Sequence, residues 1–443
     1  MASAWLARQY TTGNQRTFTI SCWVKRGSLG TRPIVSYAAT VGSGGSGARG
    51  NLSFDSDLLY FQFNPTGSSW WTYYVNTRLF RDTNAWYHIV IRVDTTDATA
   101  SNRLKIYVNG EQQTLNSTIG TQNLDTGWNA NNIYHHIGRY ASSTSITSTN
   151  TWDGGIAHFH YVDGTAYDAS TFGETDSTTG IWKPKTAPSV TYGTNGFFLK
   201  FENSASMGTD SSGQSNNLTV NGTMTQLLDT PSNVFATLNP LSTHSTLSHG
   251  NTEAEKSSVN QNYETSTTTL GITSGKYYCE CKITIDQNAP AFGISATNAN
   301  ASTTLGSEWL GGTSDTYGYW VDGTIYNNGS SVASGQSTFS TNDIMGMALD
   351  LDSTQNTLKY YKNGSLVYTV NVTTNSNGWF FATTHQNGKS GARSKFNFGN
   401  GYFRTDAVSS AQNPDDGIGI FEYDVPAGYR ALCTKSINAE EYS

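Results

Sequence analysis

Apolar and polar residues alternate along most of this chain in short runs. Runs with this period of two lie at 17–25, 58–63, 70–75, 86–94, 103–110, 134–139 and 152–161 in the first half of the chain. A period of two predicts strands with one buried face. Because turn residues interrupt the runs at regular spacing, the pattern predicts an antiparallel sandwich or barrel.

Two of these runs nearly repeat each other. NRLKIYVNG occupies 102–110 and NTLKYYKNG occupies 356–364, and both end in Asn-Gly. Asn-Gly between alternating strands predicts a type I′ hairpin turn, which needs two residues that tolerate positive φ. Each run also follows an apolar strand that ends in acidic residues, at 88–94 and 345–352. The same hairpin unit in each half indicates two related β-sandwiches.

Composition favours this all-β interpretation and excludes some classes of function. Charged residues make up 13% of the 443 residues, about half the roughly 25% usual for soluble domains, and there are 44 Gly. The net charge is −7, and no basic cluster interleaves with aromatic residues, so we expect no nucleic-acid partner. No apolar run approaches the roughly 20 residues of a membrane span, so we expect no membrane insertion. The N-terminus lacks the pattern of a signal peptide.

The four cysteines are predicted to be buried free thiols. Cys22 alternates with apolar residues, and Cys279 and Cys281 lie two apart on one predicted strand, while Cys433 lies near the C-terminus. Residues two apart share a strand face, so core packing is favoured over a metal or redox site. Free thiols are typical of folding in a reducing cytoplasm.

The first block resembles a known family. Its quoted motifs are FTISCWVKR (18–26), WYHIVI (86–91), LKIYVNG (104–110), IG (137–138) and DGGIAHFHY (153–161). In this order they are similar to the strands of laminin-G-like, concanavalin A-type jelly rolls. The family's opening element is missing before residue 17, and a similar one occurs at 196–202 and 210–222. We therefore expect a domain over 1–225 that 196–222 completes, with a plain linker hairpin as the alternative.

The second block resembles SPRY domains, which are also two-sheet jelly rolls. The motifs include GKYYCECKI (275–283), YGYW (317–320), LKYYKNG (358–364) and FNFG (396–399). The predicted fold class is all-β, with two tandem antiparallel β-sandwiches (jelly rolls) and very little helix. Residues 226–269 are predicted to be a connector, 270–400 the SPRY-like sandwich, and 401–443 a C-terminal extension. Within that extension, 425–433 is expected to pack on the SPRY sheet and 437–443 to be a tail.

Catalytic signatures are missing, and we expect no enzyme. Glycosidases of concanavalin A type often carry Glu-x-Asp-x-x-Glu, and the near matches at Glu174 and Glu422 lack the second glutamate. The Gly/Ser-rich segment 41–50 is not a nucleophile elbow. Two histidine pairs, 135/136 and 158/160, are read as exposed sheet residues in preference to metal ligands, because no ligand set surrounds them.

We expect no cofactor, with calcium left open. Laminin-G-like domains often bind calcium through loop carboxylates, which implies Asp94, Asp153 and Asp210 as candidate ligands. These residues are not spaced as a known linear site, so the prediction depends on general oxygen-ligand chemistry.

Aromatic side chains are the candidates for ligand binding. A flat ring covers an apolar sugar face while its polar edge stays wet. Two dense clusters supply the candidate residues Trp70, Trp71 and Tyr73 in the first half and Trp309, Tyr317, Tyr319 and Tyr326 in the second. About half of each cluster must face inward on a strand, so core packing is the alternative for every ring.

The order of the blocks is similar to that in virion proteins of tailed phages, especially marine ones. This resemblance implies a virion surface protein made in the host cytoplasm, with other virion proteins as partners. A tail fibre or receptor-binding component that recognises a host-surface glycan or protein is the favoured function. A capsid decoration protein is the alternative, and a divergent glycan-active enzyme is less favoured. Weak sites need multivalency, so we expect a homo-oligomer.

Overall fold

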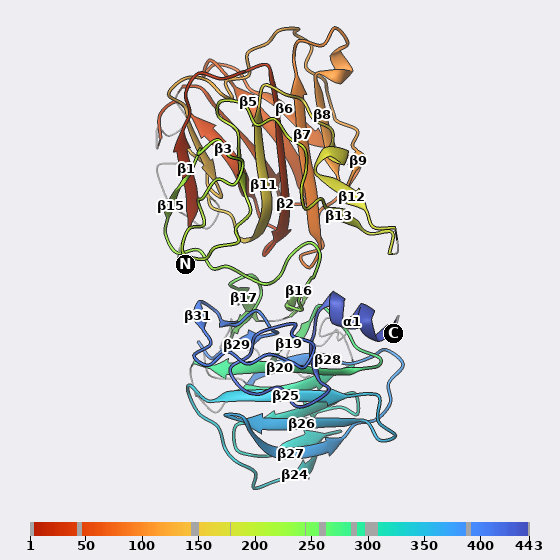
Figure 1. Cartoon of the computed structure of the whole chain (residues 1–443). Coiled ribbons are helices and arrows are strands. Elements are labelled where there is room, and N and C mark those ends of the chain that lie inside the picture. Colours follow the sequence, from red (N-terminus) through yellow and green to blue (C-terminus); the bar gives the residue numbers. More distant parts are fainter. Residues whose placement is uncertain are drawn as a thin grey trace. The chain divides into compact units, whose positions relative to one another are not determined.

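The computed structural model describes residues 4–41, 47–142, 150–177, 179–243, 245–256, 263–284, 290–296, 309–386 and 391–441. The chain divides into two compact units, Met1–Gln226 (unit 1) and Leu227–Ser443 (unit 2). Figure 1 shows that each unit is built almost entirely of strands. The all-β prediction, with two antiparallel jelly-roll sandwiches and very little helix, is therefore confirmed.

Unit 1 consists of two facing antiparallel sheets (Figure 1). Within the described residues, the larger sheet has seven strands in the order β15 (Thr219–Asn221), β1 (Trp5–Gln9), β10 (Tyr134–Ile137), β3 (Arg32–Ala38), β4 (Arg49–Asp55), β5 (Leu58–Asn64) and β6 (Trp71–Val75). The smaller sheet has six, in the order β14 (Phe197–Leu199), β11 (Gly154–Asp163), β2 (Thr17–Arg26), β7 (Trp86–Asp94), β8 (Leu104–Val108) and β9 (Glu111–Gln112). A short hairpin, β12 (Gly173–Thr175) and β13 (Trp182–Pro184), and two 3₁₀ turns, η1 (Ala100–Asn102) and η2 (Ala169–Thr171), lie in the connections.

Residues from the end of unit 1 complete both of its sheets. β14 pairs with β11, and β15 pairs with β1, each antiparallel. The segment 196–222 thus adds one edge strand to each sheet, and it does not form an isolated hairpin.

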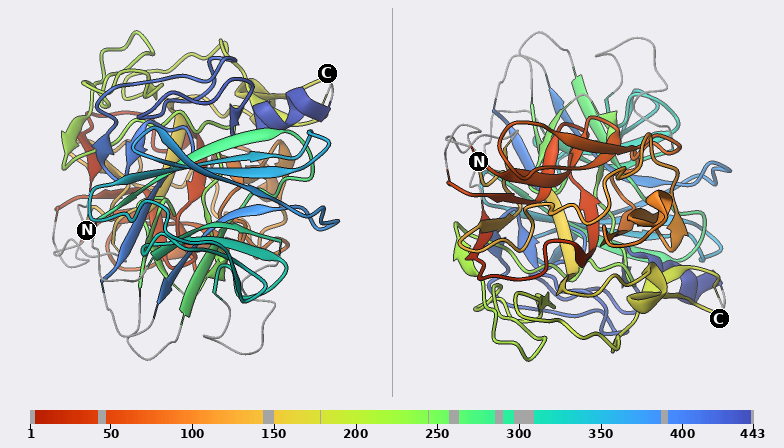
Figure 2. Two further views of the ribbon diagram at one scale, coloured as in Figure 1. Left: turned by 90° about the horizontal axis from the view of Figure 1, so that it is seen from below. Right: turned by 90° about the horizontal axis from the view of Figure 1, so that it is seen from above.

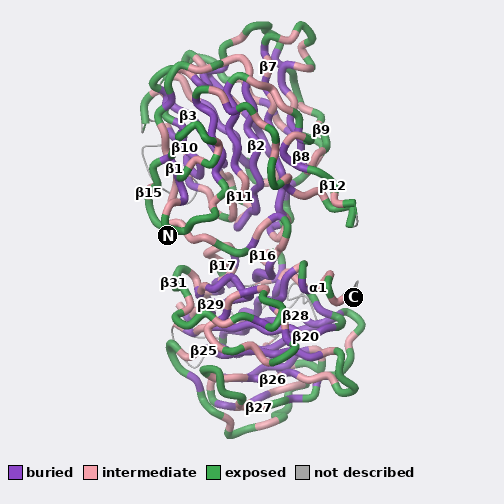
Figure 3. The backbone as a smooth tube through the Cα atoms, viewed as in Figure 1, coloured by how far each residue is buried: buried purple, intermediate pink, exposed green. Residues whose placement is uncertain are grey.

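The core of unit 1 follows directly from the alternation in the sequence. Phe18, Ile20 and Cys22 on β2 face inward and are fully buried. β2 and β7 pair in unbroken register from Thr17 opposite Asp94 to Lys25 opposite Trp86. Burial therefore runs along the middle of both sheets, as the purple segments of Figure 3 show.

Unit 2 is a second sandwich, and its two sheets form two layers (Figure 2). Among the described residues, one sheet has the order β16 (Leu238–Thr243), β19 (Tyr263–Thr268), β28 (Phe380–Gln386), β21 (Pro290–Ser295), β22 (Thr316–Trp320), β23 (Ile325–Asn327) and β24 (Ser330–Ala333). The other has the order β17 (Thr246–Ser248), β18 (Glu253–Glu255), β29 (Arg393–Asn397), β20 (Lys276–Ile283), β25 (Ile344–Asp350), β26 (Thr357–Lys362) and β27 (Ser365–Asn371), with β32 (Arg430–Ala431) parallel to β20. β30 (Tyr402–Phe403) and β31 (Asp406–Ala407) form a small hairpin.

The predicted connector at 226–269 is wrong in the structure. This stretch supplies β16 and β19 to one sheet of unit 2 and β17 and β18 to the other. The strands are short and rich in Ser and Thr, so they lack the apolar alternation that predicts a strand. Pairing with β28 and β29 supplies the order that local sequence does not indicate.

Both Asn-Gly hairpins are confirmed. Asn109 and Gly110 have φ of 49° and 84°, and Asn363 and Gly364 have φ of 48° and 81°. Each asparagine also extends the ladder, because its side-chain Oδ1 accepts the N–H of the strand before, at 2.8 and 2.9 Å. The repeated motif therefore fixes the turn and joins it to a third strand in both units.

The C-terminal extension packs on the outer face of one sheet within unit 2. Phe421, Tyr429 and Ala431 are buried together with Tyr278 and Ala348 on the outer face of the β20/β25 sheet, as expected for this segment. The predicted tail at 437–443 is wrong as far as the described residues reach, because α1 spans Thr434–Glu441. The main-chain N–H of Ile437 donates to the carbonyl oxygen of Cys433 at the start of this helix.

Burial confirms one of the side-chain predictions and overturns another. All four cysteines are free and buried, as the alternation predicted. The histidine pairs are not exposed, because His135, His136 and His160 are each 3% exposed or less. His158 and His160 do not alternate simply either, since a bulge lies between 157 and 160 and His158 has φ of 45°. No helix in the described ranges is long and apolar enough to cross a membrane.

Candidate binding sites

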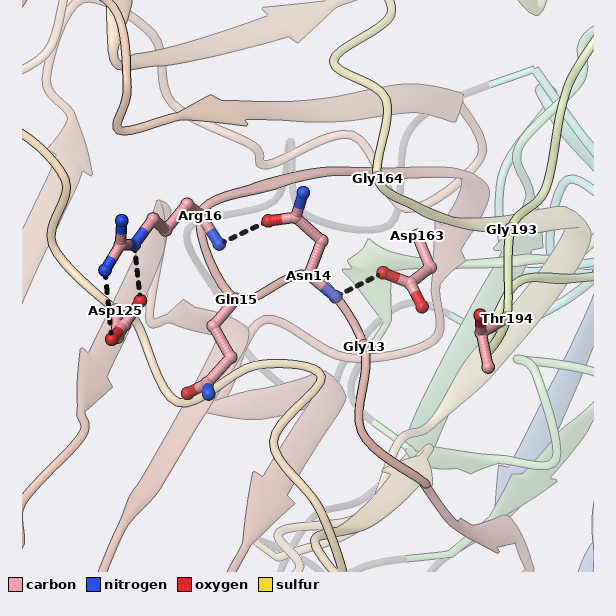
Figure 4. A pocket seen from close by; sticks show the side chains of 9 residues that line it. All are labelled: Gly13, Asn14, Gln15, Arg16, Asp125, Asp163, Gly164, Gly193 and Thr194. Carbon is pink, nitrogen blue, oxygen red and sulfur yellow. Dashed lines mark hydrogen bonds and ion pairs between the residues drawn. The ribbon is translucent and has the colours of Figure 1, made fainter.

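A polar cavity of about 520 Å³ opens at one end of the sandwich in unit 1. Three separate loops and one strand end line it, as Figure 4 shows. The lining residues are Gly13, Asn14, Gln15, Arg16, Asp125, Asp163, Gly164, Gly193 and Thr194.

Asp163 forms the buried floor of this cavity. It is the last residue of β11 and is 5% exposed. Its two carboxylate oxygens accept the main-chain N–H groups of Asn14 at 2.7 Å and Asn195 at 3.1 Å. One carboxylate therefore fixes two loops that are about 180 residues apart in the chain.

Glycine is required where the loops approach Asp163. A Cβ on Gly13 would lie 2.3 Å from Oδ2 of Asp163, and one on Gly193 would lie 2.1 Å from its carbonyl oxygen. Gly193 also has φ of 72°, which disfavours other residues. The close backbone approach brings the main-chain N–H groups of both loops to the carboxylate.

An exposed ion pair forms the cavity wall. Nε of Arg16 lies 2.7 Å from Oδ1 of Asp125, and each side chain is about half exposed. The side chain of Asn14 accepts the N–H groups of Arg16 and Thr17 at 2.9 Å, which holds the loop in an Asx-type turn. Charged and amide groups thus point at the opening from a backbone that is locally braced (Figure 4).

The arrangement suits a ligand with many hydroxyl groups. Carboxylate, amide and guanidinium groups together supply donors and acceptors at fixed positions, and the lining has no aromatic ring. A cavity of this size holds a small ligand, although such sites are usually more apolar.

The first predicted aromatic cluster is only partly available for binding. Trp70 is 43% exposed, and the guanidinium of Arg49 lies 4.9 Å from the centre of its ring. Trp71 is half-buried and stacks on Phe63. Tyr73 is 2% exposed and packs in the core, so its prediction as a ligand-binding residue is wrong.

The second predicted cluster divides in the same way. Tyr317 and Tyr319 point into the core of unit 2, at 3% and 0% exposure, so they cannot contact a ligand. Trp309 and Tyr326 are half-buried on the opposite face, with ring centres 5.3 Å apart. Strand alternation separates the two pairs, because 317 and 319 share one face of β22 while 318 and 320 share the other. Residues 297–308, which precede Trp309 in the chain, lie outside the described residues.

The three candidate calcium ligands do not come together in a metal cluster. No group of three His, Cys, Asp or Glu side chains suited to a metal occurs among the described residues. Asp210 instead accepts the N–H groups of Phe198, Ser212 and Asn216, so both of its oxygens brace its own loop. Asp94 bonds Thr96 in the turn after β7. Asp153 lies beside Gly27, whose N–H donates to its carbonyl oxygen.

One serine–histidine pair has the wrong tautomer for a nucleophile. Oγ of Ser21 lies 2.9 Å from Nε2 of His88, whose Nδ1 accepts the indole N–H of Trp182 at 2.9 Å. An indole only donates, so the proton of the neutral imidazole lies on Nε2 and points at Ser21. Burial lowers the pKa of His88 to about 3. This histidine therefore has no free nitrogen with which to take a proton from the serine.

Sequence reasoning missed the cavity residues. No motif singles out Asp163, and Asn14, Gln15 and Arg16 precede the first predicted strand. The segment Gly-Asn-Gln-Arg at 13–16 is a turn signal, but only the tertiary fold brings it to residues 125, 163 and 193.

Two domain families match the chain. The family described as the concanavalin A-like lectin/glucanases superfamily matches residues 4–166, and the SPRY domain matches residues 276–401. Both domains are therefore present, and together they suggest a binding or recognition role. No curated protein matches the chain.

Several solved structures are similar to parts of the chain. The SPRY domain of human HERC1 is 18% identical, covers 36% of this chain and 96% of its own, and has a TM-score of 0.31. The TRIM65 PSpry domain is 16% identical, with coverages of 37% and 88% and a TM-score of 0.29. A heptameric SAP-like pentraxin from Limulus polyphemus is 16% identical, with coverages of 38% and 71% and a TM-score of 0.28. At these values nothing about ligand or partner transfers to this chain.

Proposed function

We propose that this chain, which carries a concanavalin A-like domain followed by an SPRY domain, is a recognition protein that binds a glycan through unit 1. The cavity floored by Asp163 carries the proposal. In it two carboxylates, two amides, a guanidinium and main-chain groups converge on an opening of about 520 Å³. Sugar hydroxyls are both donors and acceptors, so they match this mixture of groups.

The test uses a glycan array with the full chain and two matched variants. Asp125→Asn removes the charge that orients Arg16 in the cavity wall, and it leaves the buried floor intact. Asp57→Asn breaks an ion pair of the same kind, with Arg81 at 2.7 Å, outside the cavity. We expect Asp125→Asn to weaken binding about tenfold or more, which corresponds to about 1.4 kcal/mol. Asp57→Asn should bind like the parent. Equal binding by all three proteins would place recognition elsewhere.

The biological setting we propose is the surface of a virus particle. The order of a concanavalin A-like block and an SPRY block, which is similar to phage virion proteins, supports this setting. In it the protein is made in the host cytoplasm, assembles with other virion proteins and attaches the particle to a host-surface glycan or protein. Immunogold labelling of purified particles tests the location. Adsorption of the isolated protein to host cells separates host attachment from a purely structural decoration role.

Glycan hydrolysis is the second candidate function. The same cavity presents two carboxylates, Asp125 and Asp163, which is the minimum that a glycosidase needs. Each is already engaged as an acceptor within the protein, Asp125 by the guanidinium of Arg16 and Asp163 by two main-chain N–H groups. We therefore propose binding without turnover and no resident cofactor. Release of reducing ends from glycans that the array identifies, lost in Asp125→Asn, would replace the binding proposal.

A further inference from the structure

The open edge of one sheet in unit 2 differs from the other edges of the two sandwiches. β27 spans seven residues and ends its sheet, paired only with β26 among the described residues. Its sequence, Ser-Leu-Val-Tyr-Thr-Val-Asn, contains no charge, proline or glycine. A long uncharged edge presents a row of unpaired N–H and C=O groups to any other strand.

The other edge strands are blunted in ways that β27 is not. β9, β14, β15, β17 and β24 have two to four residues each in the described structure. β16 contains Pro240, which cannot donate to a ladder. β6 is covered, because Leu115 forms a bridge with Val75 and Asn116 exchanges hydrogen bonds with Tyr74. The other edge strands are therefore protected from pairing with a further strand, and the lack of such protection at β27 needs an explanation.

The hydrogen-bond register shows which groups of β27 face outward. The main-chain N–H of Val372 donates to the carbonyl oxygen of Asn356, just beyond the β26–β27 ladder. Every second residue of β27 before it, Val370 and then Tyr368, therefore directs its main-chain groups to β26. Thr369 and Asn371 lie between them and direct their N–H and C=O groups to the open side. Both side chains are exposed.

Apolar surface and a cavity accompany this edge. Leu366 on β27 is 56% exposed, the highest value for a large apolar side chain in the described structure, and Val332 on β24 is 44% exposed. Figure 1 shows β24 and β27 on the same side of unit 2. A cavity of about 470 Å³ lies beside the first residues of β27, lined by 335–337, 362–363 and 365–367. A strand added here would gain apolar contact as well as main-chain hydrogen bonds.

We infer that β27 pairs with β27 of a second copy, antiparallel about a two-fold axis at Thr369. An uncharged strand does not repel its own copy, whereas edges are commonly protected by charge. This register places Thr369 opposite Thr369 of the second copy, and Tyr368 opposite Val370 of the second copy. Side chains that face the core of one sandwich then lie beside side chains that face the core of the other. The same patch serves both chains, as a two-fold dimer requires. The two copies would present two glycan sites together, which raises avidity.

Sedimentation velocity of the full chain tests this interface directly. We expect dimer to form over roughly 1 to 100 µM, the range for an interface of modest area. Thr369→Lys and Thr369→Asp, each alone, should be monomeric because like charges meet at the axis. An equimolar mixture of the two should recover the dimer. Thr219→Lys, on the short edge strand β15 of unit 1, is the matched control and should dimerise like the parent.

Hydrogen exchange provides a second readout at residue level. The amides of Thr369 and Asn371 should exchange more slowly as concentration rises, while those of the control edge should not change. A parent chain that stays monomeric at about 100 µM overturns the inference, and a foreign strand then becomes the occupant to seek. A dimer that Thr369→Lys leaves intact also overturns it, because the interface then lies elsewhere.

Discussion

Replacing Glu280 by glutamine should make unit 2 more stable at pH 8 and change little at acid pH. Glu280 lies on the outer face of β20 and is fully buried under the C-terminal extension. Its carboxylate accepts the N–H groups of Glu422 and Tyr423, both at 2.9 Å, and longer bonds from Asn397 and Tyr278. Two effects compete, since burial favours the neutral acid and the four donors favour the carboxylate.

Burial is the larger effect and raises the pKa of Glu280 to about 7. The folded state then holds a proton that the unfolded chain, with its ordinary pKa of 4.5, releases. The stability contributed by this group is therefore fully present below pH 4.5 and is lost as the pH rises to about 7. Linkage gives a loss of about 2.5 kcal/mol between pH 5 and pH 8.

Glutamine resembles the protonated acid, because each is neutral and presents a carbonyl oxygen as acceptor beside a donor group, O–H in the acid and NH2 in the amide. The difference in unfolding free energy between Glu280→Gln and the parent should thus grow by about 2.5 kcal/mol from pH 5 to pH 8. Urea unfolding followed by circular dichroism at several pH values measures this difference. His385 titrates with the opposite sign, because burial lowers its pKa to about 3, but it is present in both proteins and cancels.

A half-buried glutamate supplies the control. Glu255 pairs with Arg393 at 2.9 Å, and both side chains are about one third exposed, so Glu255→Gln should shift stability by less than about 1 kcal/mol. If Glu280→Gln is less stable than the parent at pH 8, the four donors outweigh burial and the reasoning is refuted. A difference that does not change with pH would refute it as well.

Three further predictions concern stability and use thermal unfolding as the measurement. Gly110→Ala should lower the free energy of unfolding by about 1–3 kcal/mol, because φ is 84° and the new Cβ would lie 2.8 Å from the indole ring of Trp182. Its control is Gly120→Ala, whose Cβ would meet nothing within 4 Å and which should lower that free energy by less than about 1 kcal/mol. Asn363→Ala should lower the free energy of unfolding by about 1–2 kcal/mol, because the turn loses a residue that tolerates positive φ and the hydrogen bond from the N–H of Ile344. An unchanged free energy of unfolding would contradict the role of Asn363 in holding the hairpin. Trp70→Ala should stay within about 0.5 kcal/mol because the ring is exposed, and a larger loss would mean that it packs as core.

Local pattern alone determined the strands that alternate and the turns that need special backbone angles. β2, β7 and the two Asn-Gly hairpins form where the sequence predicts them, because a period of two and a positive-φ dipeptide act within a few residues. The buried thiols follow from the same alternation.

Only the tertiary structure decided which polar residues act together. Asp163 meets Asn14 and Asn195 because β11 ends where two distant loops return, and no spacing in the sequence records that meeting. The polar strands β16–β19 form because neighbouring strands supply their hydrogen-bond partners. Tyr317 and Tyr319 are core while Tyr326, opposite Gly318, remains half-buried, because the sheet turns alternate residues to opposite faces and its packing decides which face is covered. The sequence carries the alternation, and packing of the two sheets selects the side that faces solvent.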